Sequence, residues 1–544
     1  MKRIKESKKE QGVLFAEHYV GDRLPKNDEV YLFEQVFERL DIRKITDSYS
    51  CEGGSMFNPK DQLAVILFAY YKGITSSVKI AEYIRYNLQF MYLAGGHIIS
   101  RRAICEFRVK HFDALRDLLK SSVNIAMEAD LVTDSSSYAL DGSKIEAHAS
   151  FSKTRRKKEW KERQKKIIDH VDNFLKEWEE QDVLEEGLEE EQEERFRRIS
   201  EKLKNIKEQN REKETDVSKE DHNKDDLPEE KTEASTTKES DKLSKFPKNR
   251  IKIKDPSSAE KYLNEHKKID SLLDKYEDAR DDMFLNLSDW DCRSMKNDRT
   301  IKESYNLQAV SNNQIIVALD VTQDENDQAQ LEPMIEQLKQ NVKIKELIKM
   351  LADAGYNRGK NLEYISNEKQ IDAYISMNDR SENKNSNDDF FHKENFTYDE
   401  SDNSWVCPEG ERLELKKEFF RDNKKHKLYA CKLIKCIYCS KKDSCIKTTA
   451  DTKRGYRTIE DDGYVVFRKQ MKEKMQHKES KEIYSGRSSE IESVFGQIKN
   501  NKNFSRFRLR GLEKVTIEST FMAVAHNFGK VIKDMIGKNE IVQC

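Results

Sequence analysis

The sequence predicts a mixed α/β protein made of several domains, and three observations lead to this prediction. A chain of 544 residues exceeds what one hydrophobic core usually supports. Hydrophobic residues make up 36% of the chain and charged residues 37%, so part of its length must be solvated helix or disordered chain. From residue 304 to residue 376, β-like runs and amphipathic helices alternate, which favours a mixed sheet flanked by helices.

Residues 1–135 are predicted to form an all-α N-terminal domain. Pro59 begins the run PKDQLAVILFAYYKG as the first helical residue, and Gly73 is positioned to end that helix. A later helix begins with several cations, and such a helix either reads DNA or serves packing and dimerisation. These cations are Arg101, Arg102, Arg108 and Lys110.

Residues 151–294 are predicted to be a charged helical insertion. Apolar residues recur at helical spacing between Trp160 and Trp178, so this helix is expected to pair with another surface. The segment at about 212–250 has no such stripe and is read as a disordered linker. Helical periodicity returns in residues 261–284, and residues 285–300 are read as a loop.

Residues 136–150, 295–395 and 455–540 are expected to form one domain around a mixed sheet. A hairpin is predicted between the runs SYNLQAVS and QIIVALDVTQ, and a buried strand is predicted to end at Asp353 and Gly355. A first short strand is predicted to end at Asp141 and Gly142. An acid at a strand end can hold a metal ion, but Asp-Gly is also an ordinary turn, which these two residues alone favour.

Residues 396–454 carry a cluster of cysteines. Cys436 and Cys439 form C-x2-C, and Cys445 and Cys407 provide two further thiols that would close a tetrahedral zinc site. Cys431 competes for the fourth position, and unligated thiols are the alternative. Zinc would also explain how a segment too polar to form its own core can fold.

The stretch from Tyr484 to Lys499 is predicted to be a helix in which Glu492, Phe495 and Lys499 share one face. Basic residues that alternate with Phe504 and Phe507 follow it, and this pattern suits a nucleic-acid backbone with bases or sugars beside it. The basic residues are Lys502, Arg506, Arg508 and Arg510. A solvated surface glutamate is the alternative for Glu492.

Two acids at strand ends and a third on a late helix are what two-metal phosphoryl transfer requires. Carboxylates from separate elements can hold two Mg²⁺ ions, or Mn²⁺, roughly 3.5–4 Å apart. Asp141, Asp353 and Glu492 are the candidates, and Asp141 is expected to bridge both ions.

These motifs resemble an insertion-sequence transposase with a ribonuclease-H-like DDE catalytic domain. The resemblance lies in ALDGSKIEAHAS, LADAGY, the block Y-x2-R-x4-E-x6-K from Tyr484 to Lys499, and FSRFRLRGLEKVTIESTFMAVAHNFGK after it. PKDQLAVILFAYYKGITSSVKIAEYI and ISRRAICEFR resemble the helical N-terminal domain of such transposases, and the cysteine segment resembles an insertion found in one branch of them.

The resemblance implies residue roles. The three catalytic acids fall on Asp141, Asp353 and Glu492, and the signature residues expected to contact transposon-end DNA fall on Tyr484, Arg487 and Lys499. Many relatives place three residues between the Arg and the Glu, whereas this chain has four, which makes Glu490 a competitor. Glu492 alone keeps six residues before Lys499.

The expected function is therefore a DNA transposase that cleaves element ends and joins them to target DNA, acting as a homodimer on paired ends. The apolar stripe from Trp160 to Trp178 could contribute to the dimer. A transposase-derived DNA-binding protein without catalytic activity and a coiled-coil scaffold are the alternatives. No apolar run approaches the ~20 residues that span a bilayer, and the N-terminus lacks a signal-peptide core, so we expect a cytoplasmic, nucleoid-associated protein.

Overall fold

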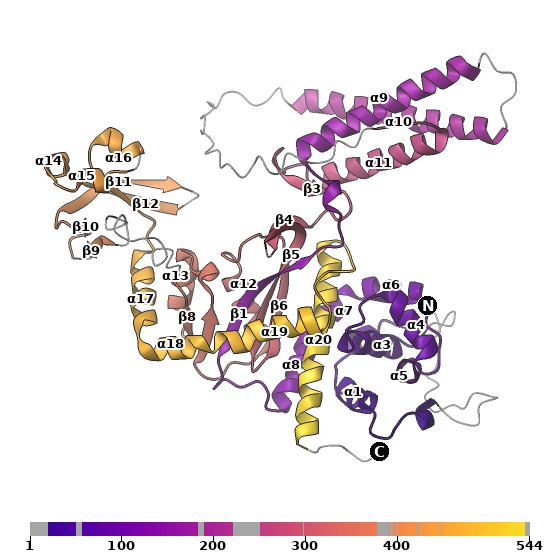
Figure 1. The fold of residues 1–544 in the computed structure, drawn as a ribbon, viewed down its shortest axis with the longest axis horizontal. Helices are drawn as coiled ribbons and strands as arrows, with labels where there is room; N and C mark the ends of the chain where they lie inside the picture. The colour runs from indigo at the N-terminus through magenta and orange to yellow at the C-terminus, as the bar shows by residue number, and fades with distance from the viewer. Residues whose placement is uncertain are drawn as a thin grey trace. The chain divides into compact units, whose positions relative to one another are not determined.

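The computed structural model describes ten stretches of the chain, which divide into two compact units (Figure 1). The first unit contains residues 1–145 and 305–544, and the second contains residues 146–304. The described residues are 20–49, 57–182, 190–220, 251–297, 299–377, 391, 395–399, 401–421, 424–447 and 449–538.

The N-terminal part of the first unit is all helical, as predicted. The helices are α1 (Glu29–Glu38), α2 (Arg43–Thr46), α3 (Pro59–Tyr71), α4 (Ser77–Tyr86), α5 (Leu88–Leu93), α6 (Arg101–Lys110), α7 (Phe112–Arg116) and α8 (Leu118–Glu128). Pro59 is in the first turn of α3. Gly73 follows the helix with φ +73°, a conformation that glycine adopts without strain, so both predicted ends of this helix are confirmed.

A long helix from the far end of the chain, α20 (Leu512–Gly537), completes the core of these N-terminal helices. The ring of Phe528 lies 5.6 Å from that of Phe33 on α1, and the ring of Phe521 lies 5.6 Å from that of Tyr70 on α3. Asn527 of α20 also accepts a hydrogen bond from the main-chain N–H of Ile316 in β6 (Ile315–Thr322). One helix therefore contributes to the helical core and contacts the sheet.

One of the predicted DNA-facing cations belongs to the core instead. Arg108 is 1% exposed, donates a hydrogen bond from Nη2 to the main-chain oxygen of Thr75, and lies over the ring of Tyr70 at 5.4 Å. The sequence could not separate it from Arg101 and Arg102, which are exposed on the same helix.

The central sheet of the first unit is mixed, in agreement with the predicted fold class. Its strand order is β5-β1-β7-β8, with β6 paired to β5. β1 (Tyr138–Glu146) runs parallel to β7 (Ile348–Ala352), and β7 runs parallel to β8 (Ile371–Ile375). β5 (Thr300–Asn312) and β6 are antiparallel and joined by Asn313 and Gln314, both with positive φ, which confirms the predicted hairpin. The helices α12 (Leu331–Asn341) and α13 (Gly359–Asn367) connect β6, β7 and β8.

The second unit is a helical bundle on a small ribbon. α9 (Lys157–Asp182), α10 (Glu190–Glu220) and α11 (Pro256–Lys275) pack together, and β2 (Thr154–Arg156) pairs with β3 (Phe284–Asn286). The predicted apolar stripe is confirmed, and its buried residues pack against the neighbouring helices of this unit. Its shared core comprises Trp160, Ile167, Val171, Leu175, Ile199, Leu203, Leu263, Ile269 and Leu272.

Two sequence predictions for this unit were wrong in part. α10 continues to Glu220, into the segment read as linker, and the remainder of that segment, residues 221–250, lies outside the described residues. The segment 285–300 was read as loop, but it completes β3 and contains β4 (Arg293–Asn297), which pairs with the first residues of β5. Edge strands this short carry too little periodicity to be recognised.

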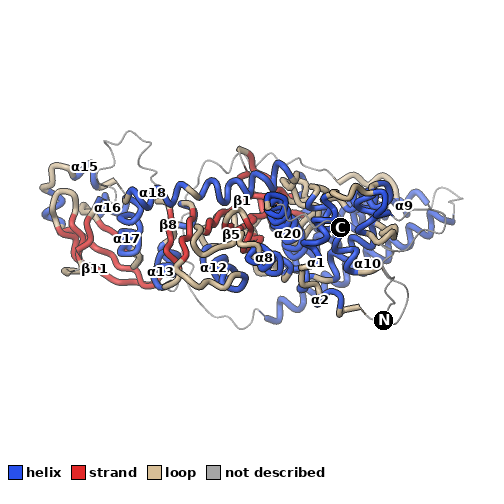
Figure 2. The backbone as a smooth tube through the Cα atoms, turned by 90° about the horizontal axis from the view of Figure 1, so that it is seen from below, coloured by secondary structure: helices blue, strands red, loops and turns tan. Residues whose placement is uncertain are grey.

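The cysteine-rich segment forms a second sheet, seen in red at the label β11 in Figure 2. Its strand order is β13-β12-β11-β10-β9. The strands are β9 (Thr397–Asp399), β10 (Ser404–Val406), β11 (Arg412–Arg421), β12 (Lys424–Cys431) and β13 (Thr458–Asp461), with the short helices α14 (Leu433–Ile437), α15 (Lys442–Cys445) and α16 (Thr449–Arg454). Trp405, Leu413 and Tyr429 are buried together. The expectation that this segment is too polar to form a core was therefore wrong.

Two helices, α17 (Val465–Gln476) and α18 (Lys478–Ser485), lead from this sheet into the predicted signature helix. Within the described part of the chain, no helix combines the length and apolar character needed to cross a bilayer.

Candidate active site

The structure brings Asp141 and Asp353 together at the centre of the mixed sheet. β1 and β7 pair in parallel, and their last paired residues are Leu140 and Ala352. Asp141 is the next residue of β1, and Asp353 directly follows the end of β7. Burial raises the pKa of Asp141 to about 6, Arg487 opposes this rise, and Asp353 adds to it. The pKa of Asp353 is also raised, chiefly by burial.

Arg487 connects this pair of acids to the C-terminal signature. Its Nη1 lies 3.2 Å from Oδ2 of Asp141, and its Nη2 lies 2.7 Å from Oε1 of Glu492. The side chains of Arg487 and Asp141 are 15% and 17% exposed, whereas that of Glu492 is 48% exposed. Ser488 donates a hydrogen bond from Oγ to the other oxygen of Glu492. Asp141 and Glu492 thus share one guanidinium.

The competing acid, Glu490, has a different partner. Its Oε2 accepts a hydrogen bond of 3.0 Å from the main-chain N–H of Gln314, in the turn of the β5–β6 hairpin. Gln314 also donates from Nε2 to the main-chain oxygen of Ser489. Glu490 therefore fastens the signature helix to the hairpin, and Glu492 is the acid of this helix that is linked to Asp141.

The signature helix is not a regular α-helix. Residues Ser488–Glu492 and Gln497–Asn501 are π-helical, with the α-helical turn α19 (Ser493–Gly496) between them. The N–H of Lys502 accordingly bonds to the oxygen of Gln497, five residues earlier. Phe495 is buried and anchors the helix as predicted. Such wide turns occur frequently at functional sites, and here they change the relative directions of Glu492 and Lys499 from those of the predicted α-helix.

The predicted turn at Gly142 was wrong, because β1 continues through Asp141 and Gly142 to Glu146. The glycine is explained by a close neighbour instead. A Cβ at position 142 would lie 2.3 Å from Oδ1 of Asp327 and 2.4 Å from Nε2 of Gln308. Gly142 therefore gives space to a carboxylate on the neighbouring loop.

That carboxylate, Asp327, was not predicted from the sequence. It lies in the loop between β6 and α12, within the run DENDQ, where neighbouring acids and amides make no single residue stand out. Lys144 was missed for a similar reason, as one lysine among many. Its Nζ lies 3.7 Å from Oδ1 of Asp327. The structure thus adds one acid and one cation to the predicted triad.

The basic segment after the signature helix divides into buried and exposed residues. Phe504 and Phe507 are fully buried and pack edge to face at 5.4 Å, and Phe507 also contacts the ring of Tyr305. They are core residues, so the expectation that they lie beside bases was wrong. Lys502 donates from Nζ to the main-chain oxygen of Tyr71, and burial lowers the pKa of this lysine to about 8.

The other predicted DNA contacts are more accessible. Arg508 and Arg510 are exposed, and Tyr484, Lys499 and Arg506 are partly exposed. The main-chain N–H groups of Arg508 and Leu509 donate to the buried carboxylate of Glu518 on α20. This contact fixes the backbone that carries the two exposed arginines.

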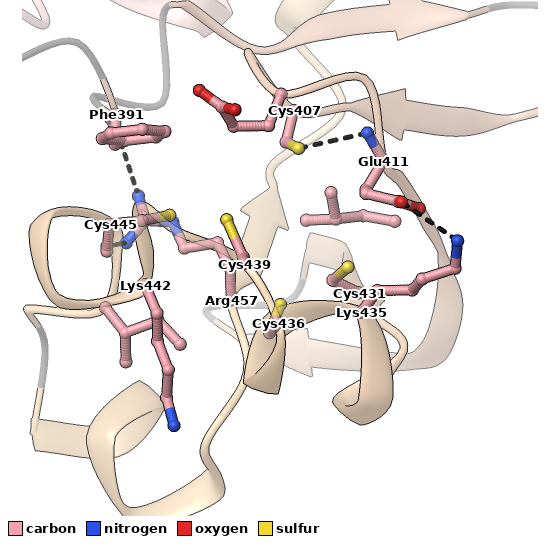
Figure 3. A pocket seen from close by; sticks show the side chains of 13 residues that line it. Phe391, Cys407, Glu411, Cys431, Lys435, Cys436, Cys439, Lys442, Cys445 and Arg457 are labelled. Atoms are coloured by element: carbon pink, nitrogen blue, oxygen red, sulfur yellow. Dashed lines mark hydrogen bonds and ion pairs between the residues drawn. The ribbon is translucent and has the colours of Figure 1, made fainter.

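All five cysteines of the second sheet line one cavity of about 30 Å³ (Figure 3). They are Cys407, Cys431, Cys436, Cys439 and Cys445. Burial raises the pKa of Cys431 to about 12 and that of Cys445 to about 11. The N–H of Glu411 donates to the sulfur of Cys407 at 3.2 Å.

In the part of the chain that the structure describes, no group of three or more His, Cys, Asp or Glu is arranged to hold a metal ion. At the acids, the guanidinium of Arg487 lies between the carboxylates of Asp141 and Glu492, so these two carboxylates do not converge on a common position for a metal ion. At the cysteines, the five thiols supply the donor type that zinc prefers, and the volume of their cavity is about that of one water molecule in the liquid.

Comparison with known families gives two matches on separate parts of the chain. A model described as transposase DDE domain matches residues 406–532, which include Arg487 and Glu492, and a model described as transposase domain (DUF772) matches residues 18–110. Searches of curated proteins and of solved structures gave no match. The two family matches agree with the resemblance carried by the sequence motifs, and together they support an insertion-sequence DDE transposase.

Proposed function

We propose that this transposase binds the ends of its element and catalyses strand cleavage and strand transfer at Asp141, Asp353 and Glu492. The observation that carries the proposal is the contact of Arg487 with both Asp141 and Glu492, beside Asp353 on the adjacent strand. The antiparallel β5–β6 hairpin next to parallel β1 and β7 supports a ribonuclease-H-like catalytic domain built from residues 136–150, 295–395 and 455–540.

The donor chemistry of this site fits divalent cations. Three carboxylates from separate elements provide the hard oxygen ligands that Mg²⁺ and Mn²⁺ prefer. Two ions held by Asp141, Asp353 and Glu492 would activate the attacking oxygen and stabilise the leaving 3′ oxygen. In their absence Arg487 balances the charge of Asp141 and Glu492.

The reaction has two steps. Water attacks the phosphorus at the element end, the bond to the 3′ oxygen breaks, and a 3′ hydroxyl remains. That hydroxyl then attacks a phosphodiester of the target DNA in line and displaces its 3′ oxygen. The protein has to hold both phosphates still, since positioning and charge stabilisation supply most of the catalysis in such transfers.

Exposed cations around the site support DNA binding. Arg508 and Arg510 extend from a backbone that Glu518 holds in place, and Arg506 lies between them and the signature helix. We propose that these arginines contact phosphates, with Tyr484, Arg487 and Lys499 contacting DNA at the acids. The sequence pattern also predicts a DNA contact for Lys502, but its ammonium donates to the main-chain oxygen of Tyr71 and lies over the ring of that residue.

Two further parts of the proposal concern assembly and zinc. Both element ends must be processed together, so we propose a homodimer on paired ends, with residues 1–135 as its helical transposase domain. The cysteine cavity would hold one structural zinc ion through Cys407, Cys436, Cys439 and Cys445, with Cys431 as the competing ligand. Such an ion would stabilise the deprotonated thiolates and the short helices that carry them.

The proposal is tested with labelled DNA from the ends of the element, with and without Mg²⁺. The variants Asp141→Ala, Asp353→Ala and Glu492→Ala should each abolish cleavage while end binding stays measurable in a gel-shift assay. Glu332→Ala is the matched control, since it removes an exposed acid at the start of α12 whose partner is Lys360. Normal cleavage by any triad variant would remove that acid from the site. End binding without cleavage by the wild-type chain would favour the inactive DNA-binding protein instead.

A further inference from the structure

A fourth carboxylate, Asp327, is held at the proposed acid site by two buried amide side chains. Its Oδ1 accepts hydrogen bonds from Nδ2 of Asn306 at 2.7 Å and from Nε2 of Gln308 at 2.6 Å. Both amides extend from β5, the neighbour of β1 in the sheet. Asn306 and Gln308 are buried, which makes their amide groups costly to leave without partners.

The same hydrogen-bond chain reaches the segment that carries Asp353. Gln308 uses its Oε1 to accept a hydrogen bond from the hydroxyl of Tyr356, which is buried three residues after Asp353. Asp353 itself accepts a hydrogen bond from the N–H of Gly355. Asp327 is thus linked through Gln308 to the turn that holds the second acid of the triad.

Two glycines leave room for this arrangement. A Cβ at Gly142 would lie 2.3 Å from Oδ1 of Asp327, a distance that real Cβ atoms do not show. A Cβ at Gly355 would lie 2.9 Å from Oδ1 of Asp353 and 3.5 Å from Oδ2 of Asp327. The carboxylates of Asp327 and Asp353 therefore both lie close to Gly355, and the carboxylate of Asp327 also lies close to Gly142.

The contacts of Asp327 leave one of its oxygens available. Both amide hydrogen bonds and the ion pair with Lys144 use Oδ1, whereas Oδ2 accepts no hydrogen bond from the residues that the structure describes. Nζ of Lys144 is buried and makes no hydrogen bond within the described residues, so its contact with Asp327 at 3.7 Å is an ion pair without a hydrogen bond.

We infer that Asp327 is a positioning residue of the acid site, which fixes the Asp353 turn against β1 and adds the negative charge that draws a divalent cation to it. This inference rests on the proposed function. Lys144 should weaken the binding of a divalent cation, because its own positive charge competes with that cation for the same carboxylates. Residues that orient ligands from outside typically change metal affinity by about 10- to 100-fold when they are replaced.

The test uses Mn²⁺ as the probe and the full chain without DNA, with bound and free Mn²⁺ separated by electron paramagnetic resonance. Asp327→Asn keeps the shape and removes the charge, so we expect Mn²⁺ binding about 10-fold weaker or more. Lys144→Gln should strengthen Mn²⁺ binding. The matched control is Glu332→Gln, which removes an exposed carboxylate paired with Lys360 at the start of α12 and should leave Mn²⁺ affinity unchanged.

Cleavage assays separate a positioning role from a structural one. Asp327→Asn should shift the Mg²⁺ concentration for half-maximal cleavage upward by a similar factor and recover at saturating Mg²⁺, whereas loss of folding would not be rescued by metal. If Asp327→Asn fails to melt cooperatively, Gly142→Ala replaces it in the test, because the added Cβ displaces the same carboxylate. Lys144→Gln remains as the variant in which Mn²⁺ binding should become stronger.

The inference and the proposed function fail in different ways. Unchanged Mn²⁺ affinity and unchanged Mg²⁺ dependence in Asp327→Asn, with the triad variants inactive, would overturn the role of Asp327 alone. Normal cleavage by the triad variants would overturn the proposed function, whatever Asp327 does. A loss of activity in Asp327→Asn at all Mg²⁺ concentrations, with Mn²⁺ binding intact, would also contradict the inference.

Discussion

Replacing Arg487 with Gln should weaken the fold and at the same time strengthen the binding of divalent cations. The guanidinium lies 3.2 Å from Oδ2 of Asp141 and 2.7 Å from Oε1 of Glu492. The contact with Asp141 is an ion pair, and removing the guanidinium leaves Oδ2 of this largely buried carboxylate without its partner, which costs about 1–3 kcal/mol. The half-exposed Glu492 adds at most about 1 kcal/mol. We therefore expect the variant to lose about 2–3 kcal/mol of stability without metal.

The same contacts oppose metal binding, because a cation shared by Asp141 and Glu492 has to displace the guanidinium. A cost of about 2–3 kcal/mol corresponds to an affinity about 30- to 150-fold lower than that of the free carboxylates. Titration of the DNA-free protein with Mn²⁺ should therefore show clearly tighter binding by Arg487→Gln than by the wild type. Mn²⁺ should also raise the melting temperature of Arg487→Gln by more than it raises that of the wild type.

The matched control is Arg468→Gln, which breaks a guanidinium–carboxylate pair with Asp462 away from the acids. It should lower the melting temperature without changing Mn²⁺ affinity. Equal Mn²⁺ affinity in Arg487→Gln and the wild type would refute the reasoning, since Arg487 would then not compete with the cation.

The described contacts also predict the effect of pH, of removing two cysteines and of two single substitutions. Burial raises the pKa of Asp141 from its ordinary value of 3.8 to about 6. The contribution of Asp141 to stability is therefore present below about pH 4 and is lost as the pH rises to about 6, whereas Mn²⁺ binding should increase over the same range. Thermal melts and Mn²⁺ titrations between pH 4 and about 7 check both expectations. Replacing Cys436 and Cys439 together with Ser should remove one zinc ion per chain, measured by elemental analysis, and metal retained by this variant would contradict the proposed ligands. Phe507→Ala should lower stability by about 3–5 kcal/mol, whereas Arg510→Gln should leave melting unchanged and weaken end binding, with a smaller salt dependence in gel-shift assays.

The sequence predicted the strand-end position of Asp353 because the run IKMLA is continuously apolar and an acid follows it. It also predicted a short strand before Asp141, but the following glycine resembled a turn. The true reason for Gly142, the carboxylate of Asp327, comes from a loop almost two hundred residues away. No local pattern contains that information, which explains why Asp327 was missed altogether.

The basic segment shows a different limit. Phe504 and Phe507 alternate with cations, and such a pattern is equally compatible with a DNA surface and with an amphipathic edge of a core. Only the position of Tyr305 and the burial of Glu518 beneath this segment decide between them. The cysteine-rich segment was misjudged because its apolar residues are few, although Trp405, Leu413 and Tyr429 come from separate strands and meet in one small cluster.

The packing of α20 against α1 and α3 has a consequence for biosynthesis. α3 is almost entirely buried, and part of its cover begins only at Leu512. At about 5–20 residues per second, the ribosome needs roughly 20–90 s to make the chain between them. Throughout this interval the apolar surface of α3 lacks its cover on the nascent chain, so chaperones that hold exposed apolar helices should associate with this protein until translation has passed α20.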